Sequence, residues 1–119
     1  MNNSALPFIG LMKKAGKLEI GEESVRAAVE RGRAYAVLSA ADASERSVRS
    51  AKGLAEAWDI GYIRLPYTKF ELGAMINRGS PGMMAITDPG FAKKLSEKLE
   101  NNGISDSNIQ GLARGGCNK

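Results

Sequence analysis

The sequence predicts an α/β protein, a single-domain three-layer α/β/α sandwich with a mixed, four-stranded sheet. Three observations favour this fold class. Short apolar segments alternate with segments whose apolar residues have helical spacing. Several expected helices begin with recognisable capping residues, and 119 residues are enough for one domain with one substantial core. Such alternation predicts a sheet that helices cover on both faces and that is at least partly parallel.

The N-terminal segment is expected to form a helix and then a short strand. Ser4 can cap this helix, which runs to about Lys14 and ends at Gly16. Residues 18–20 are the candidate strand. Gly21 then opens a second helix with two acids in its first turn, where they are favourably placed at the positive end of the helix dipole.

The second helix and the elements after it follow the same alternation. The expected buried stripe of this helix is Val25, Ala28 and Val29. Gly32 suits the position just after its end. Residues 35–40 are continuous and apolar, as in a buried strand. Residues 42–45 resemble a capping box that would start a third helix, with Asp42 as its cap.

The middle of the chain predicts two further helices and a strand between them. The apolar residues of the third helix are Val48, Ala51, Leu54, Ala55 and Trp58, and we expect Trp58 in the core. Residues 62–65 form the next strand. Thr68 and Glu71 make a capping box for a fourth helix. The expected covered residues of that helix are Leu72, Met75 and Ile76.

The C-terminal part predicts one more strand, one more helix and a tail. Residues 83–87 form the strand, in which Met83 and Met84 are core residues. Asp88 followed by Pro89 is a strong helix start. The buried side of this helix is Phe91, Ala92, Leu95 and Leu99. Residues 1–101 are therefore the expected domain, and the Asn-, Gly- and Ser-rich residues 102–119 are expected to be a flexible C-terminal tail.

Composition excludes the enzyme classes that depend on histidine or on an activated thiol. The chain has no histidine, which removes His-dependent triads, His metal sites and the commonest general base. Its one cysteine, Cys117, has no evident activating partner. We therefore expect no catalytic residue, no metal site and no cofactor. The single cysteine, with neither a secretory signal nor a membrane-length apolar stretch, indicates a cytoplasmic protein without a membrane partner.

Two motifs could still suggest catalysis. Residues 10–18 look like a phosphate loop, but five residues separate the glycines instead of four, and Leu18 replaces the hydroxyl residue. Glu22 and Glu23 could form an acid–base pair, although two acids in a first helical turn are more often partners of the dipole. The first motif lacks the pattern that a phosphate loop requires, whereas catalysis by carboxylates alone stays open as a third hypothesis.

The charge pattern favours an anionic partner. The formal net charge is +4, and Lys13, Lys14 and Lys17 lie within five positions. These lysines could contact phosphates, or they could only complement the dipole at the end of the first helix. Both interpretations stay open. Arg26, with Arg31 and Arg33, extends the basic character along and after the second helix. Phosphate contacts of this kind would position an RNA without specifying its sequence.

Five segments together resemble one known family. They occur in the order and spacing of the L-seven-Ae ribosomal protein family, and especially of its bacterial YlxQ-type branch. The resemblance covers about residues 6–100. The segments are residues 9–18 (IGLMKKAGKL), 21–29 (GEESVRAAV), 40–45 (AADASE), 71–73 (ELG) and 85–94 (AITDPGFAKK).

This resemblance implies a three-layer sandwich that binds RNA, typically kink-turn or related internal-loop structures. Transferred by position, the RNA surface comprises residues 21–27, 42–44 and 77–82. Arg26, Lys17 and Arg78 would meet phosphates, and the loop at residues 79–81 would pack near an extruded base. The implied RNA-binding residues are Gly21, Glu22, Glu23, Ser24, Arg26, Asp42, Arg78, Gly79, Ser80 and Pro81, beside the lysines at 13, 14 and 17.

The sequence departs from the family's kink-turn pattern, Gly-x-Asn-Glu-x-x-Lys, which reads sheared G·A pairs. The aligned residues are Gly21, Glu23, Ser24 and Ala27, so that only the glycine agrees. The YlxQ-type branch is similar to this chain in having Gly-Glu-Glu at this place. The resemblance thus predicts a binder of structured RNA, either ribosomal RNA or kink-turn-like elements, that associates with the ribosome. The alternative is a protein-interaction module on the same fold that has lost kink-turn recognition.

Overall fold

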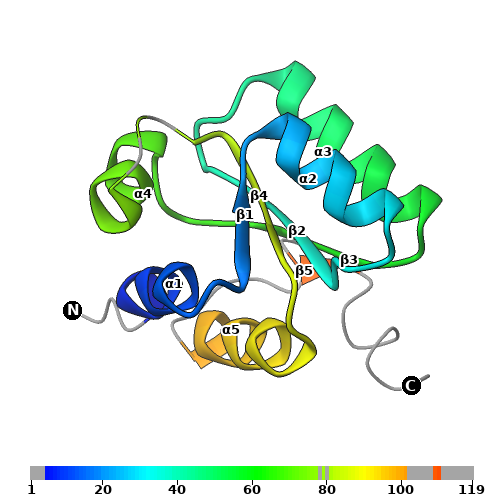
Figure 1. Ribbon diagram of the computed structural model, residues 1–119. Coiled ribbons are helices and arrows are strands. Elements are labelled where there is room, and N and C mark those ends of the chain that lie inside the picture. Colours follow the sequence, from blue (N-terminus) through cyan, green and yellow to red (C-terminus); the bar gives the residue numbers. More distant parts are fainter. Residues whose placement is uncertain (1–4, 78, 80, 102–108, 111–119) are drawn as a thin grey trace.

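The structure is a computed structural model that describes residues 5–77, 79, 81–101 and 109–110 (Figure 1). All five predicted helices and all four predicted strands are present. No helix in this part of the chain combines the length and the hydropathy that a membrane crossing requires. In chain order the elements are α1 (Ala5–Lys14), β1 (Leu18–Ile20), α2 (Glu22–Glu30), β2 (Ala36–Ser39), α3 (Glu45–Ala57), β3 (Gly61–Arg64), α4 (Lys69–Ile76), β4 (Met83–Ile86), α5 (Pro89–Asn101) and β5 (Ile109–Gln110).

The strands form one mixed sheet in the order β1-β4-β2-β3-β5. Strand β4 is antiparallel to both of its neighbours, β1 and β2, whereas β2 and β3 are parallel. The predicted mixed sheet of four strands is therefore confirmed. The two residues of β5 add to it by pairing antiparallel with β3. This strand lies within residues 102–119, where the sequence pattern predicted no strand.

Helices cover both faces of the sheet. Helices α2 and α3 pack on one face, around Val37 and Ala85 of the central strands. Helices α1, α4 and α5 pack on the other, around Leu38 and Met84. Figure 1 shows α2 and α3 on one side of the strands and α1 and α5 on the opposite side. This arrangement confirms the three-layer α/β/α sandwich.

The helix starts are capped largely as predicted, with one correction. Thr68 and Glu71 form the capping box of α4, and the Asp88 carboxylate accepts a hydrogen bond from the Phe91 backbone N–H at 3.0 Å. The prediction that Asp42 caps α3 is wrong. Ser44 is that cap, and its hydroxyl accepts from the Ser47 N–H at 3.1 Å.

Asp42 reaches a different helix. Its Oδ1 accepts from the backbone N–H of Lys69 at 2.8 Å, in the first turn of α4. The predicted cap of α3 and the observed contact with α4 would each satisfy a backbone N–H that has no partner within its own helix. The closer cap in the sequence, Ser44, already serves α3, so Asp42 is left to bind α4 across the fold.

Two residues predicted in the core are exposed. Trp58 is 48% exposed because it follows the last turn of α3 as its C-cap, beyond the stripe that faces the sheet. Met75 is 37% exposed, and its side chain packs against Gly10 of α1 and not in the core beneath α4. The missing side chain of Gly10 makes room for this contact, since a Cβ there would lie 2.9 Å from the Met75 sulfur. Met83 and Met84 are buried, as predicted.

Tyr67 gives the fold a pH dependence at alkaline pH. Burial raises the pKa of its phenol above 10.0, a backbone hydrogen bond with Leu6 opposes this, and the charge of Glu71 adds to it. Because the folded state favours the protonated phenol, its contribution to the free energy of unfolding is fully present below pH 10 and is lost as pH rises through the higher folded pKa. Urea titrations at a series of pH values from below 10 upward measure the free energy of unfolding. As pH rises, this free energy should fall less in Tyr67→Phe than in wild type. Substitution of the exposed Tyr35 by Phe should leave the wild-type loss, and equal curves for the two variants would contradict the assignment.

Candidate nucleic-acid interface

Three segments that are distant in the sequence meet at one end of the sheet, where β1 and β2 end and β4 begins (Figure 1). The Gly21 N–H, at the start of α2, donates to the Met83 carbonyl at 3.0 Å. The Ala40 N–H, just after β2, donates to the Gly82 carbonyl at 3.1 Å. Since β4 lies between β1 and β2, these two bonds attach both segments to the chain that leads into β4. We call the described residues within 21–27, 40–44 and 77–82 the candidate interface.

Gly21 has a backbone reason to be glycine. Its φ of 96° and ψ of 150° lie in a region that residues with a side chain rarely adopt. In this conformation its N–H reaches the neighbouring strand, while its carbonyl accepts from the Val25 N–H at 2.9 Å and starts α2. The one position that agrees with the kink-turn pattern therefore sets the direction of α2 as it leaves the sheet.

The two acids that begin α2 have different surroundings. The Glu22 carboxylate accepts from the Ser50 hydroxyl at 3.1 Å and from the Arg26 guanidinium at 3.3 Å. Because Ser50 lies on α3, Glu22 joins the two helices of this face. Glu23 and Ser24 are exposed. The carboxylates thus do not share one site as an acid–base pair would, and Glu23 contributes negative charge to the candidate interface.

The loop after β2 is held in place from several directions. The Ala41 N–H donates to the Tyr67 carbonyl at 2.8 Å, and the Arg64 guanidinium donates to the Ala41 carbonyl at 2.9 Å. Asp42 binds the Lys69 N–H, as described above. A Cβ at Gly82 would lie 3.9 Å from that of Ala43, so the loop also packs against the segment before β4. Because these contacts already fix the loop, it needs little further ordering when a ligand binds to it.

The predicted lysine cluster is divided by the fold. Lys13 and Lys14 end α1, and with Asn77 of the candidate interface they line a groove between α1 and α4. Lys17 precedes β1 at the end opposite Gly21. The three residues of β1 lie between the two, so the four residue steps from Lys17 to Gly21 span about 13 Å. The structure therefore brings Lys13 and Lys14 toward the candidate interface and separates Lys17 from it.

The remaining predicted residues lie in or beside the candidate interface. Arg26 is exposed on α2, one turn after Glu22. Gly79 is exposed and Pro81 is buried. Arg78 and Ser80 lie outside the described residues. The described part of the chain contains no group of three or more side chains suited to hold a metal ion.

Two exposed residues, one on α4 and one on β3, were not among the predicted site residues. Phe70 is 80% exposed in the first turn of α4, next to the contact between Lys69 and Asp42. Its position offered a signal, because it lies off the buried stripe of Leu72 and Ile76. Arg64 offered another, since it interrupts an otherwise apolar strand and its side chain reaches the loop after β2.

Comparison with known proteins places the chain in a family. Residues 5–96 match the family described as Ribosomal protein L7Ae/L30e/S12e/Gadd45 family. A Bacillus subtilis protein described as RNA-binding protein YlxQ is 33% identical over 98 residues, which cover 79% of this chain and 93% of the relative. An Enterococcus faecium protein of the same description is 34% identical over 96 residues, with 81% and 91% covered.

Solved structures have the same fold. A Bacillus halodurans protein of unknown function superposes with a TM-score of 0.74 and 25% identity, covering 81% of this chain and 96% of the other. The Giardia lamblia 15.5kD RNA binding protein superposes with a TM-score of 0.65 and 18% identity, covering 85% and 89%. At that identity the second likeness shows the fold alone. With the family match and the two relatives, this chain belongs to the L7Ae/L30e/S12e/Gadd45 ribosomal protein family, in its YlxQ-type branch.

Proposed function

We propose that this protein binds structured RNA, such as internal-loop elements of ribosomal RNA, through the candidate interface. The observation that carries the proposal is that two backbone hydrogen bonds, from Gly21 to Met83 and from Ala40 to Gly82, bring the three segments of the candidate interface together at one end of the sheet. The two YlxQ relatives, each described as RNA-binding, support it. Both relatives are named for RNA binding and not for a catalytic activity, and this chain is not an enzyme. The proposal includes a location in the cytoplasm and association with the ribosome.

The chemistry of the candidate interface suits RNA in two ways. Arg26 offers a cation to phosphates, as does Lys69, whose backbone N–H binds Asp42 and whose side chain lies beside Gly82. Lys13 and Lys14 add two more beside Asn77. The exposed ring of Phe70 offers a surface on which an unpaired base can stack. Stacking of this kind is a general feature of RNA recognition at loops and bulges. The proposal therefore places helical phosphates on the cations and an extruded base beside α4.

Gel-shift titrations test the proposal against a kink-turn RNA and against fragments of ribosomal RNA. We expect binding that weakens as salt rises, because released counterions contribute to the affinity. Arg26→Gln should lower the affinity by about fivefold and reduce the salt slope by roughly 1. The matched control is Arg33→Gln, since Arg33 is also exposed but follows the far end of α2. That variant should bind as wild type does.

The results separate this proposal from its alternative. Equal losses in the two arginine variants would indicate attraction by net charge and would contradict binding at the candidate interface. No salt-sensitive binding to any structured RNA would reject the proposal. A protein-interaction module would then remain, and the groove between α1 and α4 with its exposed Leu11 and Met75 is the feature that favours it. Protein partners recovered after nuclease treatment, and lost in Leu11→Glu, would support that alternative.

A further inference from the structure

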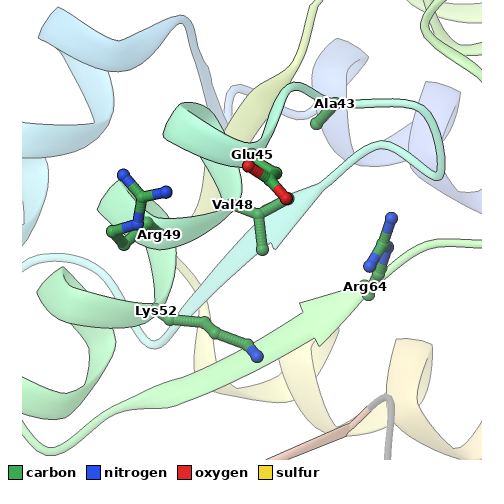
Figure 2. Close-up of a pocket in the computed structure, with 6 residues that line it drawn as sticks. All are labelled: Ala43, Glu45, Val48, Arg49, Lys52 and Arg64. Carbon is green, nitrogen blue, oxygen red and sulfur yellow. The ribbon is translucent and has the colours of Figure 1, made fainter.

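A basic hollow lies beside the candidate interface, between α3 and β3 (Figure 2). Its volume is about 300 Å³. Ala43, which belongs to the candidate interface, forms part of its wall, so the two surfaces are continuous. The residues that line the hollow are Ala43, Glu45, Val48, Arg49, Lys52 and Arg64.

The charge in the hollow is largely uncompensated. Three cations and one carboxylate line it. Among the residues that the structure describes, the ion pair found joins Arg26 to Glu22, and none of the three cations of the hollow has a carboxylate oxygen within 4.0 Å. Even Glu45, which is in the lining, makes no such pair with Arg49 one turn further along α3. The hollow therefore presents positive charge to solvent.

Two of the three cations are held by contacts with the sheet and its loops. The Arg64 guanidinium donates to the Ala41 carbonyl at 2.9 Å. The Lys52 ammonium lies 5.9 Å from the centre of the Tyr62 ring, a cation–π contact. The Tyr62 hydroxyl is in turn hydrogen-bonded to Ser39, the one buried polar residue among the described side chains. Ordering of these long side chains lowers the entropy that a ligand must remove.

The arrangement of the cations favours an extended anion. Figure 2 shows Arg49 and Arg64 on opposite sides of the hollow and the Lys52 ammonium at a third position below them, so the three cations are spread around the hollow and do not converge on one point. Cations that are spread apart in this way match successive phosphates of a nucleic-acid backbone better than one small anion. The apolar members of the lining, Ala43 and Val48, offer no donor or acceptor that would select a base. This combination is typical of contacts that position RNA without reading its sequence.

We propose that this hollow binds the phosphate backbone of the RNA helix that flanks the element held by the candidate interface. The inference rests on the proposed RNA-binding function and extends it, because it assigns Arg49, Lys52 and Arg64 to the footprint. Through Ala43 and the bond from Arg64 to Ala41, the hollow adjoins the loop after β2. An RNA held at that loop would therefore carry its adjacent helix across α3.

Binding titrations across a range of salt concentrations test this proposal. The probes are a kink-turn RNA whose two flanking helices have about ten base pairs each and a plain RNA duplex of about 20 base pairs without an internal loop. The variant is Arg49→Gln with Lys52→Gln, which removes two cations and leaves Arg64 to hold the loop. We expect roughly tenfold weaker binding near 0.1 M salt and a salt slope smaller by about 1.5, for both probes.

The matched control is Lys93→Gln with Lys94→Gln. These two lysines are exposed on α5, across the sheet from α3, and their removal changes the net charge by the same amount. The control should keep the wild-type salt slope. Circular dichroism spectra that match wild type would show that both double variants are folded.

The outcomes distinguish this proposal from the function on which it rests. Equal salt slopes for wild type and the Arg49→Gln, Lys52→Gln variant, on both probes, would overturn the hollow as a phosphate site. A wild-type protein that binds the kink-turn probe no better than the plain duplex, with the slope difference kept, would contradict recognition of a structured element but support the hollow. No salt-sensitive binding of wild type to either RNA would overturn both.

Discussion

Replacement of Leu38 by alanine is expected to lower the free energy of unfolding by about 3 kcal/mol. Leu38 is fully buried in β2, a central strand with a neighbour on each side. Its register partners are Met84 and Ile63, both fully buried in the same cluster. Truncation would remove apolar burial and leave a cavity where strands and helices meet, and the surrounding layers cannot close it without moving the sheet.

Urea denaturation followed by circular dichroism measures this loss. The matched control is Leu11→Ala, which makes the same chemical change at a residue that is 52% exposed on α1. Because little apolar burial is lost there, the control should shift the free energy of unfolding by no more than about 0.5 kcal/mol. Comparable losses in both variants would show that Leu38 does not occupy the tightly packed centre of the sandwich.

Local signals in the sequence were enough to predict most of this fold. The capping box at Thr68 and the Asp88-Pro89 start depend on residues within one helical turn, and the structure has both. The core positions of β2 and β4 followed from continuous apolar runs. What local pattern could not predict was the destination of Asp42, whose partner Lys69 is 27 residues away. A side chain of this kind can cap whichever helix start the fold brings near it.

The candidate interface also depends on contacts that local sequence patterns do not predict. Its three segments meet because the last long strand, β4, inserts between β1 and β2. Strand order is a property of the whole sheet, and no residue within any one segment encodes it. The segments were expected from the family resemblance alone. Conversely, the hollow of Arg49, Lys52 and Arg64 combines a helix with a strand, so it became visible only when the structure placed α3 against β3.

Restoration of the kink-turn pattern is expected to raise affinity for kink-turn RNA by about a hundredfold, the effect of roughly two good base-reading contacts. The variant carries Glu23→Asn, Ser24→Glu and Ala27→Lys. Glu23 and Ser24 are exposed at the start of α2, so both positions accept new polar side chains without disturbing the core. Asparagine supplies a donor and an acceptor to a base edge, whereas an ionised Glu23 only accepts and repels phosphates.

The choice of RNA separates base reading from simple relief of repulsion. The single variant Glu23→Gln removes the negative charge alone, and it should bind a kink-turn RNA and a matched RNA with Watson–Crick pairs in place of the sheared G·A pairs with the same small gain. The triple variant should gain its full effect only on the RNA that keeps the G·A pairs. Because Gly21 sets the direction of α2 from the sheet through its backbone, the new side chains would be presented on a helix start that this chain already holds in place. An equal gain of the triple variant on both RNAs would instead mean that charge governs binding here and that the helix start does not face the bases.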